Sequence, residues 1–159
     1  MRKIGLFIIL FITSTSFCND KEYTSYCNAR FNFCMKYPSS FKMRQQSENN
    51  DGAIFTSKDG KTEIWAYGRL AIEDLDKLEQ EFGFATDKIK ITYRVMKNSW
   101  FVFSGVDTTG NTIYQKTVKK AVDYFGDSGT NVFQTIRISY PPSQQEKYKD
   151  YCDIIAKSL

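Results

Sequence analysis

Residues 26–41, "YCNARFNFCMKYPSSF", alternate apolar and polar side chains, carry two cysteines and stop near a proline. Phe31, Phe33 and Met35 fall on one face of an extended chain, because successive side chains of a strand point to opposite faces. Pro38 ends the run, since proline has no N–H to donate to a sheet. The stretch predicts a half-buried strand, and it raises the question of whether its cysteines do chemistry.

The absence of histidine from the sequence answers most of that question. It excludes Ser-His-Asp and Cys-His catalysis and histidine-ligated zinc. No Cys-x-x-Cys pair is present either, so a structural role for the cysteines is favoured. The segment "GDSG" at 126–129 resembles the nucleophile segment of chymotrypsin-like proteases. Ser128 has no histidine to take its proton, and a hairpin turn explains the segment better.

The N-terminal residues have the layout of a secretory signal peptide. Two basic residues precede the apolar run "IGLFIILFI" at 4–12, and small polar residues follow it. The run is too short to span a bilayer. We therefore predict a signal peptide over residues 1–18 and one α+β domain over 21–159, in a periplasmic or secreted protein.

Cys18 leaves lipid attachment open as an alternative to simple cleavage. Phe17 and Thr15 depart from the usual lipoprotein pattern, in which a small residue precedes the cysteine and an aliphatic residue lies three before it. Contact with a membrane is expected only if Cys18 is lipidated.

The charge balance does not indicate a nucleic-acid partner. Without Arg2 and Lys3, the 22 basic residues become 20 against 18 acidic ones, a net charge of about +2. No run of five or more like charges occurs in the chain. We therefore expect no nucleic-acid binding.

Disulfides are the expected state of cysteines in an oxidising compartment. Cys152 lies on the apolar stripe of the last predicted helix, and Cys34 points away from the face that this helix would cover. Cys27 precedes the strand and is freer to reach the helix. We therefore predict a Cys27–Cys152 bridge with Cys34 reduced and buried; the alternative is Cys27–Cys34.

Beyond residue 41, short runs with a period of two and tight Asp-Gly turns predict further strands. Acidic residues and an apolar repeat at Ile72, Leu75, Leu78 and Phe82 predict a helix over 72–82, with Gly83 just past its end. A second helix is predicted after Pro141-Pro142. Its signals are a capping box formed by Ser143 and Glu146 and an apolar stripe. The stripe comprises Tyr148, Tyr151, Cys152, Ile155 and Leu159.

These patterns predict an α+β fold. It is a meandering antiparallel sheet of about six to eight strands with helices packed on it, because short turns favour antiparallel pairing.

The segment "RFNFCMKYPSSF" resembles the beginning of PsbP-like proteins. The later order of a hairpin near Asn-Asp-Gly, a helix, further strands, "SYPP" and a last helix is also similar to that family. The resemblance covers about residues 26–159 and implies an α/β/α sandwich. It also implies a binding or accessory role, as in photosystem II or Ran-dependent nuclear transport, and it assigns no functional residue.

Strand parity suggests where a ligand would bind. Ile64, Ala66, Gly68 and Leu70 are expected on one face, with Val132, Ile136 and Ile138, and so are Ile89, Ile91, Tyr93 and Val95. The opposite face then carries aromatic and cationic side chains that could bind an anionic or carbohydrate-like ligand. The predicted ligand-binding residues are Trp65, Tyr67, Arg69, Lys90, Arg94 and Arg137. The alternative is that the helix at 72–82 covers this face and makes Trp65 and Phe133 part of a second core.

The sequence thus predicts an extracytoplasmic, non-enzymatic binding or accessory domain for an unknown protein or an anionic or carbohydrate ligand, without a cofactor. One alternative is a carboxylate-based hydrolase, and another is a lipid-anchored structural protein of the envelope. The carboxylates considered for hydrolysis are Glu63, Glu73, Asp74, Asp107 and Asp123.

Overall fold

The computed structural model describes residues 22–72 and 76–159. The predicted signal peptide, Cys18 and three residues of the first predicted helix lie outside these ranges. The strands are β1 (Tyr23–Asn28), β2 (Phe33–Pro38), β3 (Lys42–Gln46), β4 (Gly52–Thr56), β5 (Glu63–Leu70), β6 (Lys90–Met96), β7 (Trp100–Val106), β8 (Thr112–Tyr124) and β9 (Asp127–Tyr140). The helices are α1 (Leu78–Thr86), a 3-10 turn η1 (Pro142–Gln144) and α2 (Gln145–Ser158).

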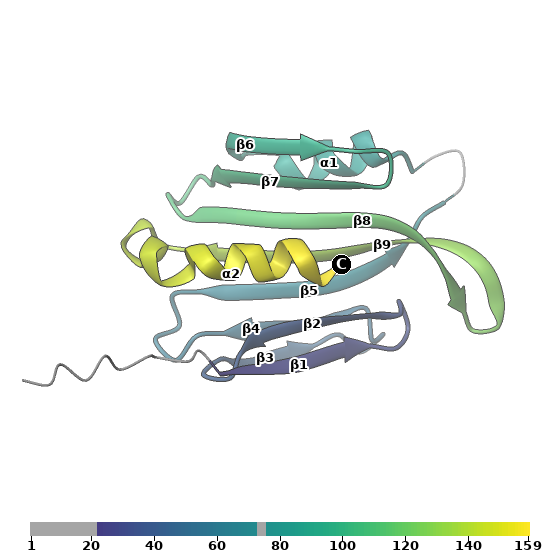
Figure 1. The fold of residues 1–159 in the computed structure, drawn as a ribbon, viewed down its shortest axis with the longest axis horizontal. Coiled ribbons are helices and arrows are strands. Elements are labelled where there is room, and N and C mark those ends of the chain that lie inside the picture. Colours follow the sequence, from purple (N-terminus) through teal and green to yellow (C-terminus); the bar gives the residue numbers. More distant parts are fainter. Residues whose placement is uncertain (1–21, 73–75) are drawn as a thin grey trace, which may run out of the picture.

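Seven strands form one antiparallel sheet in the order β3-β4-β5-β9-β8-β7-β6, and β1 pairs with β2 in a separate hairpin. The hairpin and α2 cover one face of the sheet, and α1 lies on the other face near β6 and β7 (Figure 1). The predicted α+β architecture is confirmed.

The main core lies between the sheet and the layer made by α2 and the β1–β2 hairpin. Tyr148, Tyr151 and Ile155 of α2 are buried there, as the apolar stripe predicts. From the sheet, β4, β5 and β9 contribute the residues that parity places on this face. These are Ala53, Phe55, Ile64, Ala66, Val132, Ile136, Ile138 and Tyr140.

Phe31, in the turn between β1 and β2, anchors the hairpin to the sheet. The ring lies directly on Gly68 of β5, where a Cβ atom would come within 2.3 Å of the ring carbon Cγ. The Gln134 side-chain amide donates to the Phe31 carbonyl at 2.7 Å, and Asn28 Oδ1 accepts from the Phe31 N–H at 2.9 Å. The β1–β2 hairpin is therefore attached to the sheet through the ring and the backbone of Phe31.

The predicted disulfide is wrong. Cys27 pairs with Cys34 across the β1–β2 hairpin, and Cys152 is a free, half-buried thiol. The reason is register, because Cys27 and Cys34 are direct cross-strand partners with Cα atoms 4.1 Å apart. Both point away from the core, so Cys34 is neither reduced nor buried.

Removing this bridge is expected to lower the free energy of unfolding by about 2.5 kcal/mol, because it closes a short loop. The comparison is Cys27→Ser/Cys34→Ser against the unmodified protein in urea denaturation. Cys152→Ser is the matched control, and we expect it to change stability by less than about 1 kcal/mol. An equal loss of unfolding free energy in Cys152→Ser would show that the loss in the double variant does not come from the disulfide.

The first helix begins at Leu78, six residues later than predicted. The Asp76 carboxylate accepts from the Ile72 N–H at 2.9 Å and pairs with Arg69 at 2.8 Å. Asp76 thus links Ile72 and Arg69 ahead of the helix, and Ile72 is exposed. Gly83 lies inside α1 rather than beyond its end.

The predicted capping box of the last helix does not form. Pro142 starts the 3-10 turn η1, and α2 begins only at Gln145, without a side-chain cap. The side chain of Gln144 instead joins this turn to the β4–β5 connection. It donates to Asp59 at 2.6 Å and accepts from Thr62 at 2.6 Å.

Asp59 makes folding sensitive to acid. Hydrogen bonds, first from the Ser57 hydroxyl and then from the Lys61 N–H, lower the Asp59 pKa from 3.8 to about 2. A hydrogen bond from Arg69 likewise lowers the Asp76 pKa. A carboxyl whose pKa is lower in the folded state stabilises the protein above its unfolded pKa and loses that effect on acidification.

We therefore expect the free energy of unfolding to fall between about pH 4 and pH 2. Denaturation at a series of pH values measures this. Asp59→Asn should flatten the curve in that window. Asp87→Asn is the control, because the Asp87 carboxylate makes no hydrogen bond with the described residues. Identical curves for the two variants would contradict the assignment.

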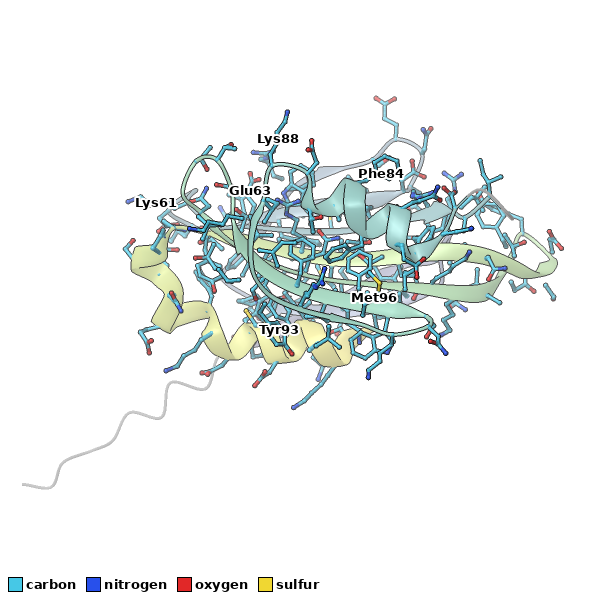
Figure 2. The ribbon with its side chains drawn as sticks, turned by 90° about the horizontal axis from the view of Figure 1, so that it is seen from above. Lys61, Glu63, Phe84, Lys88, Tyr93 and Met96 are labelled. Atoms are coloured by element: carbon cyan, nitrogen blue, oxygen red, sulfur yellow. A yellow bond between two sulfur atoms is a disulfide. The ribbon has the colours of Figure 1, made fainter. Side chains whose placement is uncertain are left out.

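A bulge in β6 changes the predicted faces of that strand. The register shifts between Ile91 and Tyr93, so Ile91 pairs with Gly105 on the α1 face and Tyr93 pairs with Ser104 on the α2 face. Tyr93 lies on the side of α2, opposite Phe84 of α1 (Figure 2). The prediction that Ile89, Ile91, Tyr93 and Val95 share one face is wrong, because a bulge inverts the alternation beyond it.

Candidate functional site

The second face of the sheet is covered over only part of its width. There α1 packs on β7 and its neighbours and buries an apolar cluster: Ala71, Leu78, Phe101, Phe103, Ile113 and Phe133. Trp65, on β5, lies beyond this cover with 41% of its surface exposed. The alternative prediction, that α1 buries Trp65 and Phe133 in a second core, is therefore correct for Phe133 and wrong for Trp65.

A pocket of about 310 Å³ opens beside Trp65. Its wall is formed by β4, β5 and β9 together with the β3–β4 turn. The lining residues are Ser47, Asp51, Gly52, Ala53, Ile54, Trp65, Tyr67 and Arg137. This volume lies at the low end of the ~300–1,000 Å³ usual for small-molecule sites.

Cross-strand pairing places the three side chains that dominate the pocket. Trp65 of β5 is the register partner of Arg137 of β9, and Tyr67 is the partner of Thr135 in the next row. Partners in an antiparallel pair point to the same face with Cβ atoms about 5 Å apart. Two aromatic side chains and one guanidinium therefore meet on one face of two adjacent strands.

Arg137 is the unusual group of the site. It is half-buried, yet its guanidinium makes no hydrogen bond or salt bridge with any residue in the described parts of the chain. Burial lowers its pKa, and Tyr67 and Asp107 partly oppose that shift. A desolvated cation without a hydrogen-bond partner costs folding free energy, and such costs concentrate at sites that bind a ligand.

Trp65 is held in one orientation. The indole N–H donates to Glu63 Oε2 at 3.1 Å, and the other oxygen of Glu63 accepts from Arg44 at 2.9 Å. Glu63 lies on the same side of the sheet as α1 (Figure 2). With its N–H occupied, the indole is left to contact a ligand through its apolar surface.

Asp51 does not cancel the charge of Arg137. The Asp51 carboxylate pairs with Arg30 at 2.6 Å, and Arg30 also donates to the Tyr124 hydroxyl. The charge that remains in the pocket is therefore positive.

Arg69 has a different role from the one predicted. Its guanidinium bonds Asp76 at 2.8 Å and Glu81 at 2.5 Å, and it lies 4.5 Å from the ring centre of Phe133. It fixes the segment before α1 to β5. It does not line the pocket.

The remaining two predicted cations lie far along the sheet. Arg94 is on the pocket's face but at β6, which is separated from β5 by three strands. Lys90 pairs with Val106, which alternation places on the α2 face. Of the six predicted ligand-binding residues, the structure brings Trp65, Tyr67 and Arg137 together.

The alternation of side chains along the strands could not predict the part of the pocket that a loop forms. Ser47 and Asp51 come from the β3–β4 turn, which the sequence marks only as an Asn-Asp-Gly turn. Gly52 lies so close to Tyr67 that a Cβ atom would approach its Cβ to 2.6 Å. That contact is visible only in the structure, and the sequence offered no more than the glycine itself.

The carboxylates considered for hydrolysis have other contacts. Asp107 Oδ1 accepts from Thr109 and Asn111 within its own loop, and Asp123 accepts from the Gly126 N–H in the β8–β9 turn. Glu63 bonds Arg44 and Trp65, whereas Glu73 and Asp74 lie outside the described residues. Within residues 22–72 and 76–159, no three or more acidic or cysteine side chains are grouped so as to hold a metal ion.

None of the helices in the described part of the chain is long and apolar enough to cross a membrane.

Comparison with known proteins identifies the fold. No family model and no curated protein matches the sequence. Among solved structures, cyanobacterial PsbP (CyanoP) from Synechocystis sp. PCC 6803 superposes with a TM-score of 0.60 at 9% identity, covering 92% of this chain and 96% of that one. LpqN, involved in cell envelope biogenesis of Mycobacterium tuberculosis, superposes with a TM-score of 0.52 at 14% identity, covering 87% and 83%. The chain therefore has the PsbP-like fold, as the resemblance implies.

Proposed function

We propose that this protein is an extracytoplasmic, non-enzymatic binding domain whose ligand site is the pocket between Trp65, Tyr67 and Arg137. The observation that carries the proposal is the half-buried guanidinium of Arg137. It has no hydrogen-bond or salt-bridge partner among the described residues, and it lies beside an indole with a fixed orientation. A ligand anion would provide the hydrogen-bond acceptors that the protein does not.

The location outside the cytoplasm rests on separate support. The order of charged, apolar and small polar residues at the N-terminus is that of a signal peptide. The disulfide between two exposed cysteines suits an oxidising compartment. The named role of one solved neighbour in cell envelope biogenesis agrees with this location.

Thermal unfolding with a ligand panel tests the binding role, because a ligand that binds only the folded state raises Tm. The panel contains neutral, carboxylated, sulfated and amino monosaccharides and short peptides. We expect at least one class to raise the Tm of the wild type and to have no effect on Trp65→Ala. Equal shifts in the two proteins, or none with any class, would contradict a ligand site in this pocket.

A further inference from the structure

On the basis of the proposed function, we infer that the pocket takes a carboxylated sugar. Its carboxylate would pair with Arg137, and its ring would lie against Trp65. Three features of the pocket lead to this chemical class. They are the single charge that no salt bridge neutralises, the aromatic and polar side chains around it, and the strands of the floor, whose backbone groups are already paired.

The charge indicates an anion carrying a single negative charge. Among the described residues that line the pocket, Arg137 is the one cation, and the one carboxylate, that of Asp51, lies 2.6 Å from Arg30. A guanidinium presents a planar fork of donors that fits one carboxylate through two parallel hydrogen bonds. A dianion such as a phosphate monoester would place a second charge in the pocket near Asp51, where the described part of the chain lines the pocket with no second cation to balance it.

The remaining lining groups suit a sugar ring. Trp65 offers an exposed apolar surface, and Glu63 fixes the plane of the indole through its N–H. Ser47, Asp51 and Tyr67 add hydroxyl and carboxylate groups around that surface. An aromatic surface ringed by hydrogen-bonding groups complements a pyranose, which has apolar C–H patches and hydroxyls at its edge.

The backbone beneath the pocket favours a small ligand over a peptide strand. The floor is formed by β4, β5 and β9, and residues 63–67 of β5, which include Trp65 and Tyr67, are paired on both sides, with β4 and with β9. No sheet edge is therefore open in the pocket for an extended peptide to join. Recognition has to come from side chains, and the volume of about 310 Å³ suits a ligand of one or two rings.

The test compares matched monosaccharides by isothermal titration calorimetry. The probes are methyl galacturonoside, which has one carboxylate, and methyl galactoside, which is neutral. Galactose 1-phosphate and N-acetyl-alanyl-alanine represent a dianion and a peptide carboxylate. We expect the galacturonoside to bind at least about tenfold more tightly than each of the others, because hydrogen bonds to charged groups are the strongest available.

Arg137→Gln should abolish the preference for the galacturonoside over the galactoside. Arg94→Gln is the matched control, because it removes an arginine from the same face outside the pocket, and we expect it to keep the preference. Arg137→Gln should also unfold at the same or a higher temperature than the wild type, since it removes a desolvated charge. A lower unfolding temperature would show that Arg137 is structural and would overturn the inference.

The outcomes separate this inference from the proposed function. Neutral sugars that bind as tightly as the galacturonoside, with Trp65 required and Arg137 not, would overturn the ligand class and leave the binding role intact. Tighter binding of the peptide carboxylate or the phosphate would do the same. The absence of binding by any sugar or peptide would refute both.

Discussion

Gly68→Val is expected to destabilise the protein by about 3 kcal/mol or more. A Cβ at this position would lie 2.3–2.6 Å from the ring and Cβ of Phe31, which is fully buried. Overpacking of this kind forces a rigid neighbour or the backbone to move. The neighbour cannot move alone, because Gln134 and Asn28 hold the Phe31 backbone.

Urea denaturation measures the effect, and two further variants define its cause. Gly83→Ala is the control: nothing lies within 4 Å of the added carbon, and alanine is favoured in a helix by about 0.5–1 kcal/mol. Phe31→Ala alone should cost about 3–5 kcal/mol. The double variant Phe31→Ala/Gly68→Val should then be less destabilised than the sum of the two single variants. Strict additivity would mean that the two residues are not in contact in solution.

Arg69→Met is expected to destabilise the protein by about 2 kcal/mol. The substitution leaves the carboxylate of Glu81, which is 7% exposed, without its partner. Breaking a fully buried pair costs about 3–5 kcal/mol, and the value is reduced here because Arg69 is partly solvated. Arg69→Met/Glu81→Gln should recover part of the loss, because it also removes the stranded charge.

The same variant distinguishes the roles of two arginines that the sequence places in one group. Arg69→Met should lower stability and leave ligand affinity unchanged. Arg137→Gln should weaken binding of methyl galacturonoside without lowering stability. Calorimetric titration of both variants with methyl galacturonoside, alongside denaturation, measures the two effects. Loss of binding in Arg69→Met at a temperature where it remains folded would assign Arg69 to the ligand site.

The faces of the sheet could be predicted wherever alternation ran without interruption. β5 and β9 keep strict alternation, so Trp65 and Arg137 are correctly assigned to the face opposite the main core. The bulge in β6 adds one residue to the strand and inverts the faces after it, and no residue type announces it. Lys90 precedes the bulge and Arg94 follows it, so the two do not share a face as regular alternation predicts, and the prediction for Lys90 is wrong.

The disulfide and the role of Arg69 depended on information that parity does not contain. Cys27 and Cys34 bridge because of the exact register of a hairpin whose turn could not be placed from its residues. Arg69 differs from Arg137 in its neighbours: Asp76 and Glu81 form salt bridges with Arg69, whereas no carboxylate of the described residues forms one with Arg137, which Asp107 attracts only at longer range. Only the tertiary arrangement could show which arginine remained unpaired.

The most direct test of the ligand site is the NMR spectrum of the two tryptophan indole N–H groups. Trp65 lines the pocket, and Trp100 pairs with Val118 on the opposite face. On titration with methyl galacturonoside, we expect the Trp65 signal to shift in proportion to binding and the Trp100 signal to stay in place. A shift of Trp100 with Trp65 unmoved, or no shift of Trp65 at saturating ligand, would contradict a site between Trp65, Tyr67 and Arg137.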